Sequence, residues 1–259
     1  MFFDILFLGD DMDIIKYKKL TKGRYKIYFD NKEEMILYEE VILRYNLLVY
    51  KKIDNTNQKE IEDYNNECLV YHTALDNINK RFKSISDIRD YLYKKDFEKK
   101  YIDKVINKLV EQGYLNDEIF AKNYINNQIF ISNKGPYKIK RELLSHHINE
   151  DIINSMLEIF TIELQEPKIR KIISKFYNSN KSMGGNVLKK KIEHNLVSLG
   201  YSYESYKNII NEFDFNNNKE IAKKEYDKLY KRLSKKYEGN ELDYMIKNKL
   251  YQKGLHYED

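Results

Sequence analysis

The chain has 259 residues, of which 42% are hydrophobic, so its length and apolar content allow a sizeable buried core. Its single cysteine, Cys68, excludes an internal disulfide framework and favours a reducing compartment, the cytoplasm. The net charge of +5 is modest, and the chain has only two prolines and nine glycines, which favours long helices over turn-rich β structure.

The first apolar run, FFDILFL at residues 2–8, is only seven residues long and lacks a basic flank. It is followed by the acidic stretch GDDMD at residues 9–13. A membrane-spanning helix needs about 20 apolar residues, and a signal peptide begins with positive charge. We therefore expect neither a signal peptide nor a membrane span here.

Two short strands are the next predicted elements, at residues 24–29 and 35–38, where apolar and polar side chains alternate. Asp30 and Asn31 lie between them and favour a turn, so the pair is predicted to form a small β-hairpin. A short helix is expected at 39–47. Residues 49–61 are expected to link the hairpin to the rest of the chain.

From about residue 65 onward, the spacing of apolar residues predicts only helices. First helices are expected near 65–81, 117–131, 166–178 and 218–236, second helices near 85–95, 136–146, 185–199 and 240–252, and third helices near 98–111, 149–160 and 202–213. They group into three three-helix units and a truncated fourth. The expected divisions are 1–60 for the hairpin and short helix, then 61–116, 117–163, 164–216 and 217–259 for the four units.

A repeated motif supports this grouping. It consists of a leucine, four other residues and a second apolar residue, and it recurs at intervals of 51 to 54 residues. The pairs are Leu92/Phe97, Leu143/Ile148, Leu196/Tyr201 and Leu250/Leu255, and the residues before their second members are Asp96, His147, Gly200 and Gly254. These residue types enter the left-handed conformation that ends helices more readily than most others. The predicted fold is therefore all-α, with tandem three-helix repeats forming an elongated curved solenoid and a small N-terminal β-hairpin region.

After each of the first three copies of the motif, apolar residues recur at the same offsets and lie on one face of a helix. The positions expected to be buried within their own units are Leu92, Ile106, Leu143, Leu157, Leu196 and Phe213. Asn149 and Ser202 are expected to cap the N-termini of third helices.

The sequence contains no motif that names a reaction. It has no phosphate-binding loop, no His-Glu-x-x-His and no Cys-x-x-Cys. His146 and His147 lie at a predicted helix end without a third ligand at metal-binding spacing, so a turn role is favoured over a metal site. Asp87 with Asp90 and Glu150 with Asp151 are interpreted as charges on helix surfaces and first turns. We predict no catalytic residue, metal or cofactor, and hence no enzyme.

Three segments closely resemble, in order, the core of the RecX family of recombination regulators: residues 81–97, 109–125 and 133–148. The residues that carry the resemblance are Arg81, Ser84, Ile88, Leu92, Gly113, Tyr114, Leu115, Asn116, Asp117, Phe120, Ala121, Lys134, Gly135, Pro136, Ile139, Glu142 and Leu143. Asp96 and His147 stand where the family usually has glycine, and Asn116 where aspartate is common. The replacements are compatible with turns, so they leave the expected fold unchanged.

The resemblance implies a small cytoplasmic, all-helical protein that binds the RecA recombinase filament on DNA and inhibits it. RecA as partner is supplied by the resemblance alone. We also expect a monomer that does not associate with membranes. Any contact with DNA is expected to be non-specific and indirect. Stacked helical repeats are compatible with this role because they present an extended surface to another polymer.

Positive charge is concentrated in the C-terminal half of the chain. The balance of basic over acidic residues is zero in 1–60 and in 61–116, −2 in 117–163, +4 in 164–216 and +3 in 217–259. A polyanion is therefore expected to prefer the third and fourth units.

The basic residues of the third unit are the predicted contact with the RecA–DNA filament. They are Lys168, Arg170, Lys171 and Lys175 on its first helix and Lys189, Lys190 and Lys191 on its second. The apolar stripes of the two helices direct these cations toward solvent, where they can equally form an ordinary solvated face. The alternative contact, on the second unit, is Lys138, Lys140 and Arg141.

Two other functions remain open on the sequence. The chain is alternatively a non-specific DNA-binding helical-repeat protein, which a steep salt dependence on naked DNA would favour. It is alternatively a helical-repeat scaffold of unrelated purpose, which failure to co-sediment with RecA–DNA filaments would favour. Base-specific readout is not predicted, because no helix carries the set of Arg, Asn and Gln residues that reads bases.

Overall fold

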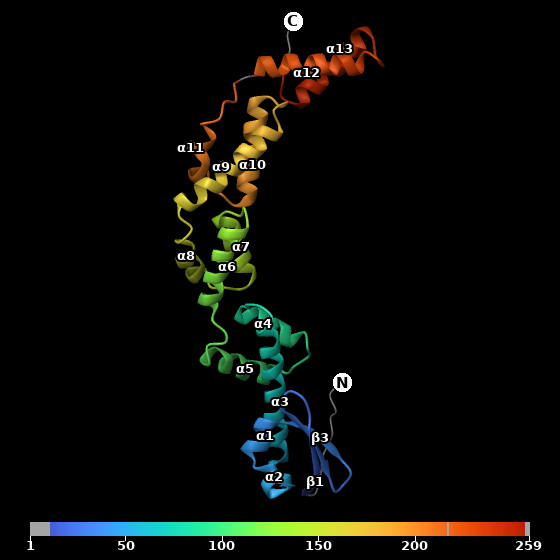
Figure 1. Cartoon of the computed structure of the whole chain (residues 1–259), viewed down its shortest axis with the longest axis vertical. Helices are drawn as coiled ribbons and strands as arrows, with labels where there is room; N and C mark the ends of the chain where they lie inside the picture. The colour runs from blue at the N-terminus through green and yellow to red at the C-terminus, as the bar shows by residue number, and fades with distance from the viewer. Residues whose placement is uncertain (1–10, 217, 257–259) are drawn as a thin grey trace. The chain divides into compact units, whose positions relative to one another are not determined.

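The computed structural model describes residues 11–216 and 218–256, so the interpretation of residues 2–8 lies outside the described residues. The chain divides into two units, residues 1–120 and 121–259, and the division falls inside helix α6 (Asp117–Ile131). Figure 1 shows the strands near the N-terminus and helices along the rest of the chain. No helix in the described ranges is long and apolar enough to cross a membrane.

The N-terminal region is an antiparallel sheet of four strands in the order β3-β2-β1-β4. The predicted hairpin is confirmed as β2 (Arg24–Phe29) and β3 (Glu34–Tyr38). The other two strands, β1 (Met12–Lys19) and β4 (Lys52–Ile53), are absent from the sequence prediction. Their apolar signal is weak, because β1 is exposed from Ile15 onward and β4 has only two residues.

The prediction that residues 49–61 form a linker is wrong. Ile53 is buried and pairs with Met12 of β1, which places this segment at an edge of the sheet. Helix α3 then begins at Asn55, directly behind the extended residue Asp54. The polar residues that resemble a linker form the first turns of this helix, where most of them are exposed and Gln58 is buried.

The remaining elements of the first unit are helices: α1 (Glu39–Arg44), α2 (Leu47–Tyr50), α3 (Asn55–Ile78), α4 (Ile85–Tyr93) and α5 (Lys99–Glu111). The long helix α3 contributes to two hydrophobic cores. Ile61 and Cys68 pack with the sheet, and Val70 and Ala74 pack with α4 and α5. Helix α3 therefore crosses the division expected at residue 60.

The second compact unit, residues 121–259, contains the rest of α6 and seven further helices of the described chain. They are α7 (Pro136–Ser145), α8 (Glu150–Leu157), α9 (Ile162–Ser179), α10 (Gly185–Leu199), α11 (Tyr203–Ile210), α12 (Asn218–Leu233) and α13 (Gly239–Gln252). The predicted positions agree within a few residues. The largest difference in this unit is at α9, which begins at Ile162 rather than near 166 and contains Pro167. In the first unit the difference is larger, because α3 begins at Asn55 rather than near 65. The fold is mostly helical with a small N-terminal strand region, whereas the curved solenoid stays a prediction.

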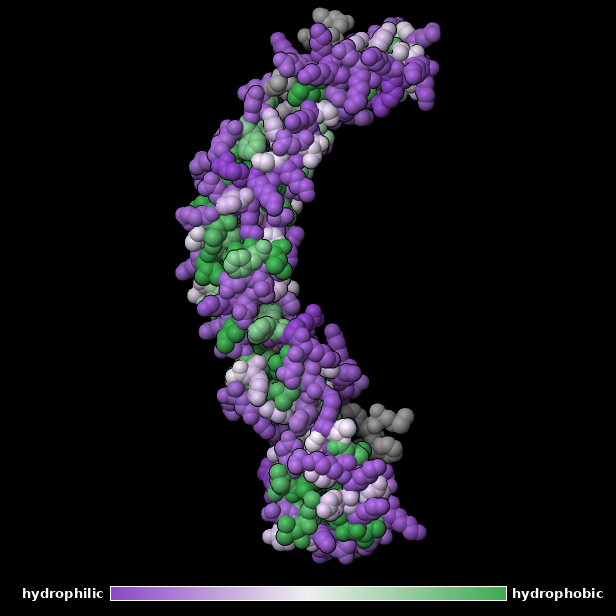
Figure 2. All heavy atoms as spheres, viewed as in Figure 1, coloured by the Kyte–Doolittle hydropathy of each residue, from purple (hydrophilic) through white to green (hydrophobic). Residues whose placement is uncertain are grey.

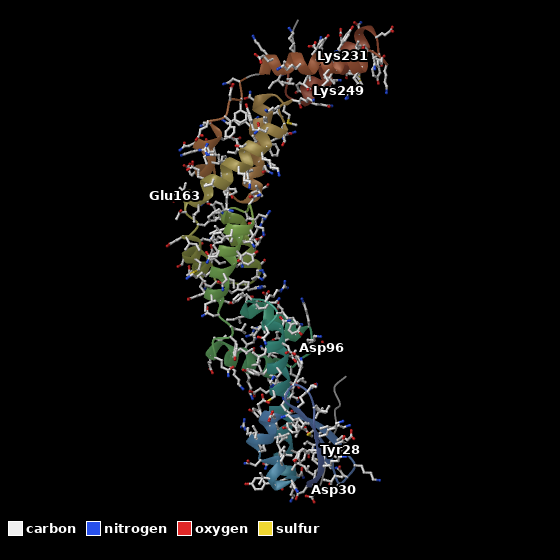
Figure 3. The ribbon with its side chains drawn as sticks, in the orientation of Figure 1. Tyr28, Asp30, Asp96, Glu163, Lys231 and Lys249 are labelled. Atoms are coloured by element: carbon white, nitrogen blue, oxygen red, sulfur yellow. The ribbon has the colours of Figure 1, made fainter. Side chains whose placement is uncertain are left out.

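The repeated leucine motif forms the same helix-ending turn in all four of its copies. Asp96, His147, Gly200 and Gly254 all have positive φ, between 56° and 90°. In each turn the N–H of the second apolar residue donates to the carbonyl of the leucine, as in Phe97 to Leu92 at 3.4 Å and Leu255 to Leu250 at 2.9 Å. This bond and the apolar pair that accompanies it define the Schellman motif. Figure 3 labels Asp96, which holds the turn between α4 and α5.

Most of the predicted core positions are buried. Leu92, Leu143 and Leu196 are fully buried, and Ile106 is nearly so. Leu157 and Phe213 are only half-buried, so their prediction is wrong in degree. Leu157 is the last residue of α8 and Phe213 follows the end of α11, so neither has a further helical turn to cover it.

The second helices of successive repeats, α7, α10 and α13, contact one another at their ends. The N–H of Gly135, which precedes α7, donates to the carbonyl of Leu199 at the end of α10, at 2.7 Å. In the same way, Gly184 before α10 donates to Lys253 after α13, at 2.8 Å. Each contact satisfies N–H and C=O groups that helix ends leave unpaired, and it brings the positive N-terminal end of one helix dipole next to the negative C-terminal end of another.

Tyr201 holds one of the four turn positions, and its side chain is buried. Its hydroxyl has no hydrogen-bond partner among the described protein atoms, and burial raises its pKa to about 12. An unpaired buried polar group costs roughly 1–3 kcal/mol. We therefore expect Tyr201→Phe to raise the melting temperature measured by circular dichroism. Tyr177→Phe, which removes a hydroxyl that donates to Asp214 O at 2.6 Å, should lower it.

The same phenol predicts a pH dependence. An unfolded tyrosine ionises near pH 10, whereas Tyr201 keeps its proton to about pH 12 in the folded chain. The folded state then binds more protons, so stability is lost as the pH rises from 10 toward 12. The Tyr201→Phe chain should lose less stability over this interval than the parent, and an equal loss would contradict the burial of an unpaired phenol.

Candidate partner-binding surface

The basic residues of α9 divide between two faces of the helix. Lys168, Lys171 and Lys175 are spaced at i, i+3 and i+7 and share one face, whereas Arg170 lies on another. Ile169 and Ile173 are fully buried between them, which turns the cations away from the core. The prediction that the apolar stripe directs these cations toward solvent is confirmed for Lys171 and Lys175, which are exposed. It is wrong in degree for Lys168 and Arg170, which are half-buried.

Two of these cations have internal partners. Lys168 Nζ donates to the carbonyl of Ser132 at 2.8 Å, just after the end of α6, and burial followed by the nearby Lys171 lowers its pKa. Arg170 forms ion pairs with Glu212 and with Glu166, which raise its pKa. Carboxylates therefore largely neutralise Arg170, and a backbone carbonyl holds the ammonium of Lys168 against the fold, so both are weak candidates for contacting a partner.

The lysines of α10 point in different directions. Lys189 is half-buried, and its Nζ donates to Asn211 Oδ1 at 3.0 Å. Lys190 and Lys191 are exposed, and Lys191 Nζ lies 3.7 Å from Met183 Sδ. Only two of the three predicted residues therefore face solvent with most of their side chain.

An apolar groove runs between α9 and α10, with a volume of about 410 Å³. Phe176 and Val187 supply its apolar surface, and Lys190, Lys191 and His194 stand along it. Exposed Lys171 and Lys175 lie on α9, and in the described chain they form no ion pair. The groove and these lysines are called the basic groove from here on. It combines cations with apolar surface, which suits an acidic partner surface that also offers an apolar side chain.

The alternative cations on α7 are less available. Lys140 pairs with Glu150 at 2.6 Å and donates to Asn154 at 2.8 Å. Lys138 is half-buried, and Arg141 is exposed. Only Arg141 of the three therefore presents most of its charge to solvent.

The residues that sequence analysis assigned to turns and first turns have those roles. His147 has a φ of 56° in the turn after α7. Asp87 and Ser84 form a capping box, with Asp87 N–H donating to Ser84 Oγ at 3.0 Å. Asn149 caps α8 through its side chain, whereas Ser202 occupies the cap position of α11 without such a bond. In the ranges that the structure describes, no group of three or more His, Cys, Asp or Glu side chains is placed to hold a metal ion.

Sequence analysis missed that Phe176 belongs to the groove as well as to the core. Its place in the apolar stripe of α9 predicts burial, but it is half-buried and lines the groove together with residues of α10. Val187 and His194 of α10 complete this surface. The spacing of the two helices decides such exposure, and no local pattern in the sequence signals it.

Comparison with known proteins identifies the chain. Residues 116–157 match the model of the second three-helix domain of RecX, a segment that overlaps the predicted second unit. A protein of Listeria welshimeri named "Regulatory protein RecX" is 30% identical over 94% of this chain and 92% of its own length. The chain belongs to the RecX family. A Streptococcus gordonii relative of the same name is 28% identical and covers 96% of both chains.

Solved RecX structures are similar as well. A crystal structure of regulatory protein RecX has a TM-score of 0.68 and 25% identity, covering 78% of this chain and all of the other. The structure of RecX from Lactobacillus salivarius has a TM-score of 0.54 and 28% identity over 57% of this chain. The names of these relatives describe a regulatory protein, and RecX is a family of regulatory proteins rather than of enzymes, which agrees with the prediction of no enzyme.

Proposed function

We propose that this RecX chain binds the RecA recombinase filament on DNA through the basic groove and inhibits the ATPase and strand-exchange activities of RecA. It acts in the cytoplasm as a monomer and without a cofactor. The observation that carries the proposal is the basic groove. Exposed Lys190 and Lys191 line its apolar surface and have no acidic partner among the described residues, and exposed Lys171 and Lys175 lie on the neighbouring helix α9.

The physical argument concerns which charges remain for a partner. Arg170 and Lys140 are neutralised by Glu212 and Glu150, so they contribute little at long range. The lysines of the basic groove are not neutralised in this way, and they attract a negatively charged filament in a manner that salt weakens. The apolar floor adds a contribution that salt does not screen.

The test is reversal of the groove charges in the variant Lys175→Glu, Lys190→Glu, Lys191→Glu. We expect co-sedimentation with RecA–DNA filaments to weaken at least tenfold and inhibition of the RecA ATPase to be relieved. The substituted glutamates carry negative charge, so an acidic surface of the filament repels them where it attracted the lysines. The helical signal and melting temperature should stay close to those of the parent, because all three residues lie on exposed surface.

A matched control reverses three exposed lysines of the first unit, Lys94, Lys95 and Lys99. It changes the net charge by the same amount and should bind filaments nearly as the parent does. If the groove variant inhibits as well as the parent across a salt titration, the contact lies elsewhere, and Arg141 with Lys138 and Lys140 is the next surface to reverse. A parent chain that does not co-sediment at all would refute the proposal and favour a scaffold of other purpose.

A further inference from the structure

The terminal helices α12 and α13 carry a second basic surface, built from residues other than those of the basic groove. Residues 218–256 contain eleven lysines and arginines against six aspartates and glutamates. Glu225 is buried and pairs with Lys228 and Lys253, whereas the other cations of this segment form no ion pair within the described chain. Figure 2 shows mainly hydrophilic surface over this pair, and Figure 3 labels Lys231 on α12 and Lys249 on α13.

Two of the exposed aromatic rings on this surface belong to helix α13. Tyr244, Lys247 and Tyr251 occupy positions i, i+3 and i+7 of α13, so they share one face of the helix. Tyr244 is 65% exposed and Tyr251 is 70% exposed. The buried residues of α13, which include Ile246, lie on the opposite side. We call Tyr244, Lys247 and Tyr251 the tyrosine ridge.

The spacing of the ridge suits a flexible strand that offers flat rings and regular negative charge. Seven residues of α-helix rise about 10 Å, so the two rings are separated by about that distance along the helix, with a lysine between them. Exposed aromatic rings interleaved with cations are the elements of sites that bind single strands, because bases stack on the rings and phosphates pair with the lysines. A duplex hides the faces of its bases, and an acidic protein surface would use the lysines without needing the rings.

We propose that the tyrosine ridge binds single-stranded DNA, with bases stacked on Tyr244 and Tyr251 and a phosphate beside Lys247. The choice of DNA rests on the proposed function, which brings the chain to a filament formed on DNA. The remaining cations of α12 and α13 add non-specific attraction to the phosphate backbone. The ridge therefore gives the chain a DNA contact that does not depend on RecA.

The experiment measures binding of the full chain to a fluorescein-labelled oligo(dT) by fluorescence anisotropy over a series of salt concentrations, without RecA. The double variant Tyr244→Ala, Tyr251→Ala should bind at least about tenfold more weakly at every salt concentration, because it removes both rings on which bases stack. Lys247→Ala should instead reduce the slope of log affinity against log salt by about 0.7, the value for one phosphate contact of a single strand.

A matched control removes two tyrosines of equal exposure outside the ridge. Tyr50 is 71% exposed and Tyr137 is 65% exposed, so Tyr50→Ala, Tyr137→Ala removes a similar amount of aromatic surface. This control should bind oligo(dT) as the parent does. A loss in the control equal to that of the ridge variant would overturn the proposal, and so would parental affinity in the ridge variant.

Two further outcomes decide the identity of the ligand. Tighter binding to an RNA of the same length would overturn the assignment to DNA. If the ridge variant loses affinity for polyglutamate as strongly as for oligo(dT), the ridge recognises negative charge in general and the proposal fails. The assay contains no RecA, so its result is independent of filament binding. If the chain does not bind oligo(dT) but co-sediments with filaments, only the proposed DNA site on the ridge is refuted. If the chain binds oligo(dT) through the ridge but does not co-sediment with RecA–DNA filaments, only the proposed function is refuted.

Discussion

Replacing Gly200 by alanine should lower the free energy of unfolding by about 2–5 kcal/mol. Gly200 has a φ of 90°, where a side chain costs roughly 1–2 kcal/mol. A Cβ at this position would also lie 2.4 Å from the backbone nitrogen of Lys138, and forcing atoms into a packed site costs a further 1–3 kcal/mol or so. The substitution thus strains the turn after α10 and separates it from α7. Urea unfolding followed by circular dichroism measures the loss.

Gly113 provides the matched control, because it also has a positive φ, 75°, but no atom lies within 4 Å of the position of an added Cβ. Gly113→Ala should therefore cost only the backbone strain, about 1–2 kcal/mol. Equal losses for the two variants would show that α7 and α10 do not meet as described. The sequence alone predicts only the strain, about 1–2 kcal/mol even for Gly200→Val and less for Gly254→Val, because it does not show the neighbouring helix.

Truncating Leu143 to alanine should cost about 2–5 kcal/mol, the range for a well-packed buried leucine. Leu143 is fully buried in α7, and its carbonyl accepts the hydrogen bond from Ile148 that closes the turn. The loss comes from removed apolar contacts and from the cavity that remains. Thermal and urea unfolding should both show it.

The adjacent Leu144 is the control, since it has the same side chain on the same helix and is 41% exposed. Leu144→Ala should change the free energy of unfolding by about 0.5 kcal/mol or less, as is usual for surface positions. If the two variants are equally stable, the repeated leucine is not a core position and the alignment of the units is wrong.

The sequence by itself determined the helices and their turns, because both depend on local features. Apolar residues that recur with the helical period mark the buried face of α9 and α10, whatever the rest of the chain does. The turn at Gly200 or His147 likewise follows from a residue that tolerates positive φ and from an apolar pair five positions apart. The RecX resemblance depends on these local segments, which is why it could be stated from residues alone.

Only the tertiary structure decided which strands pair, where helices meet end to end, and which cations remain available. Met12 pairs with Ile53, and Gly135 donates to Leu199, through contacts between segments far apart in the sequence. Arg170 looks equivalent to Lys171 in the sequence, yet Glu212, which follows α11, neutralises Arg170 alone. The charge that a residue offers to a partner depends on such distant neighbours and on desolvation, and neither quantity is a property of its local sequence.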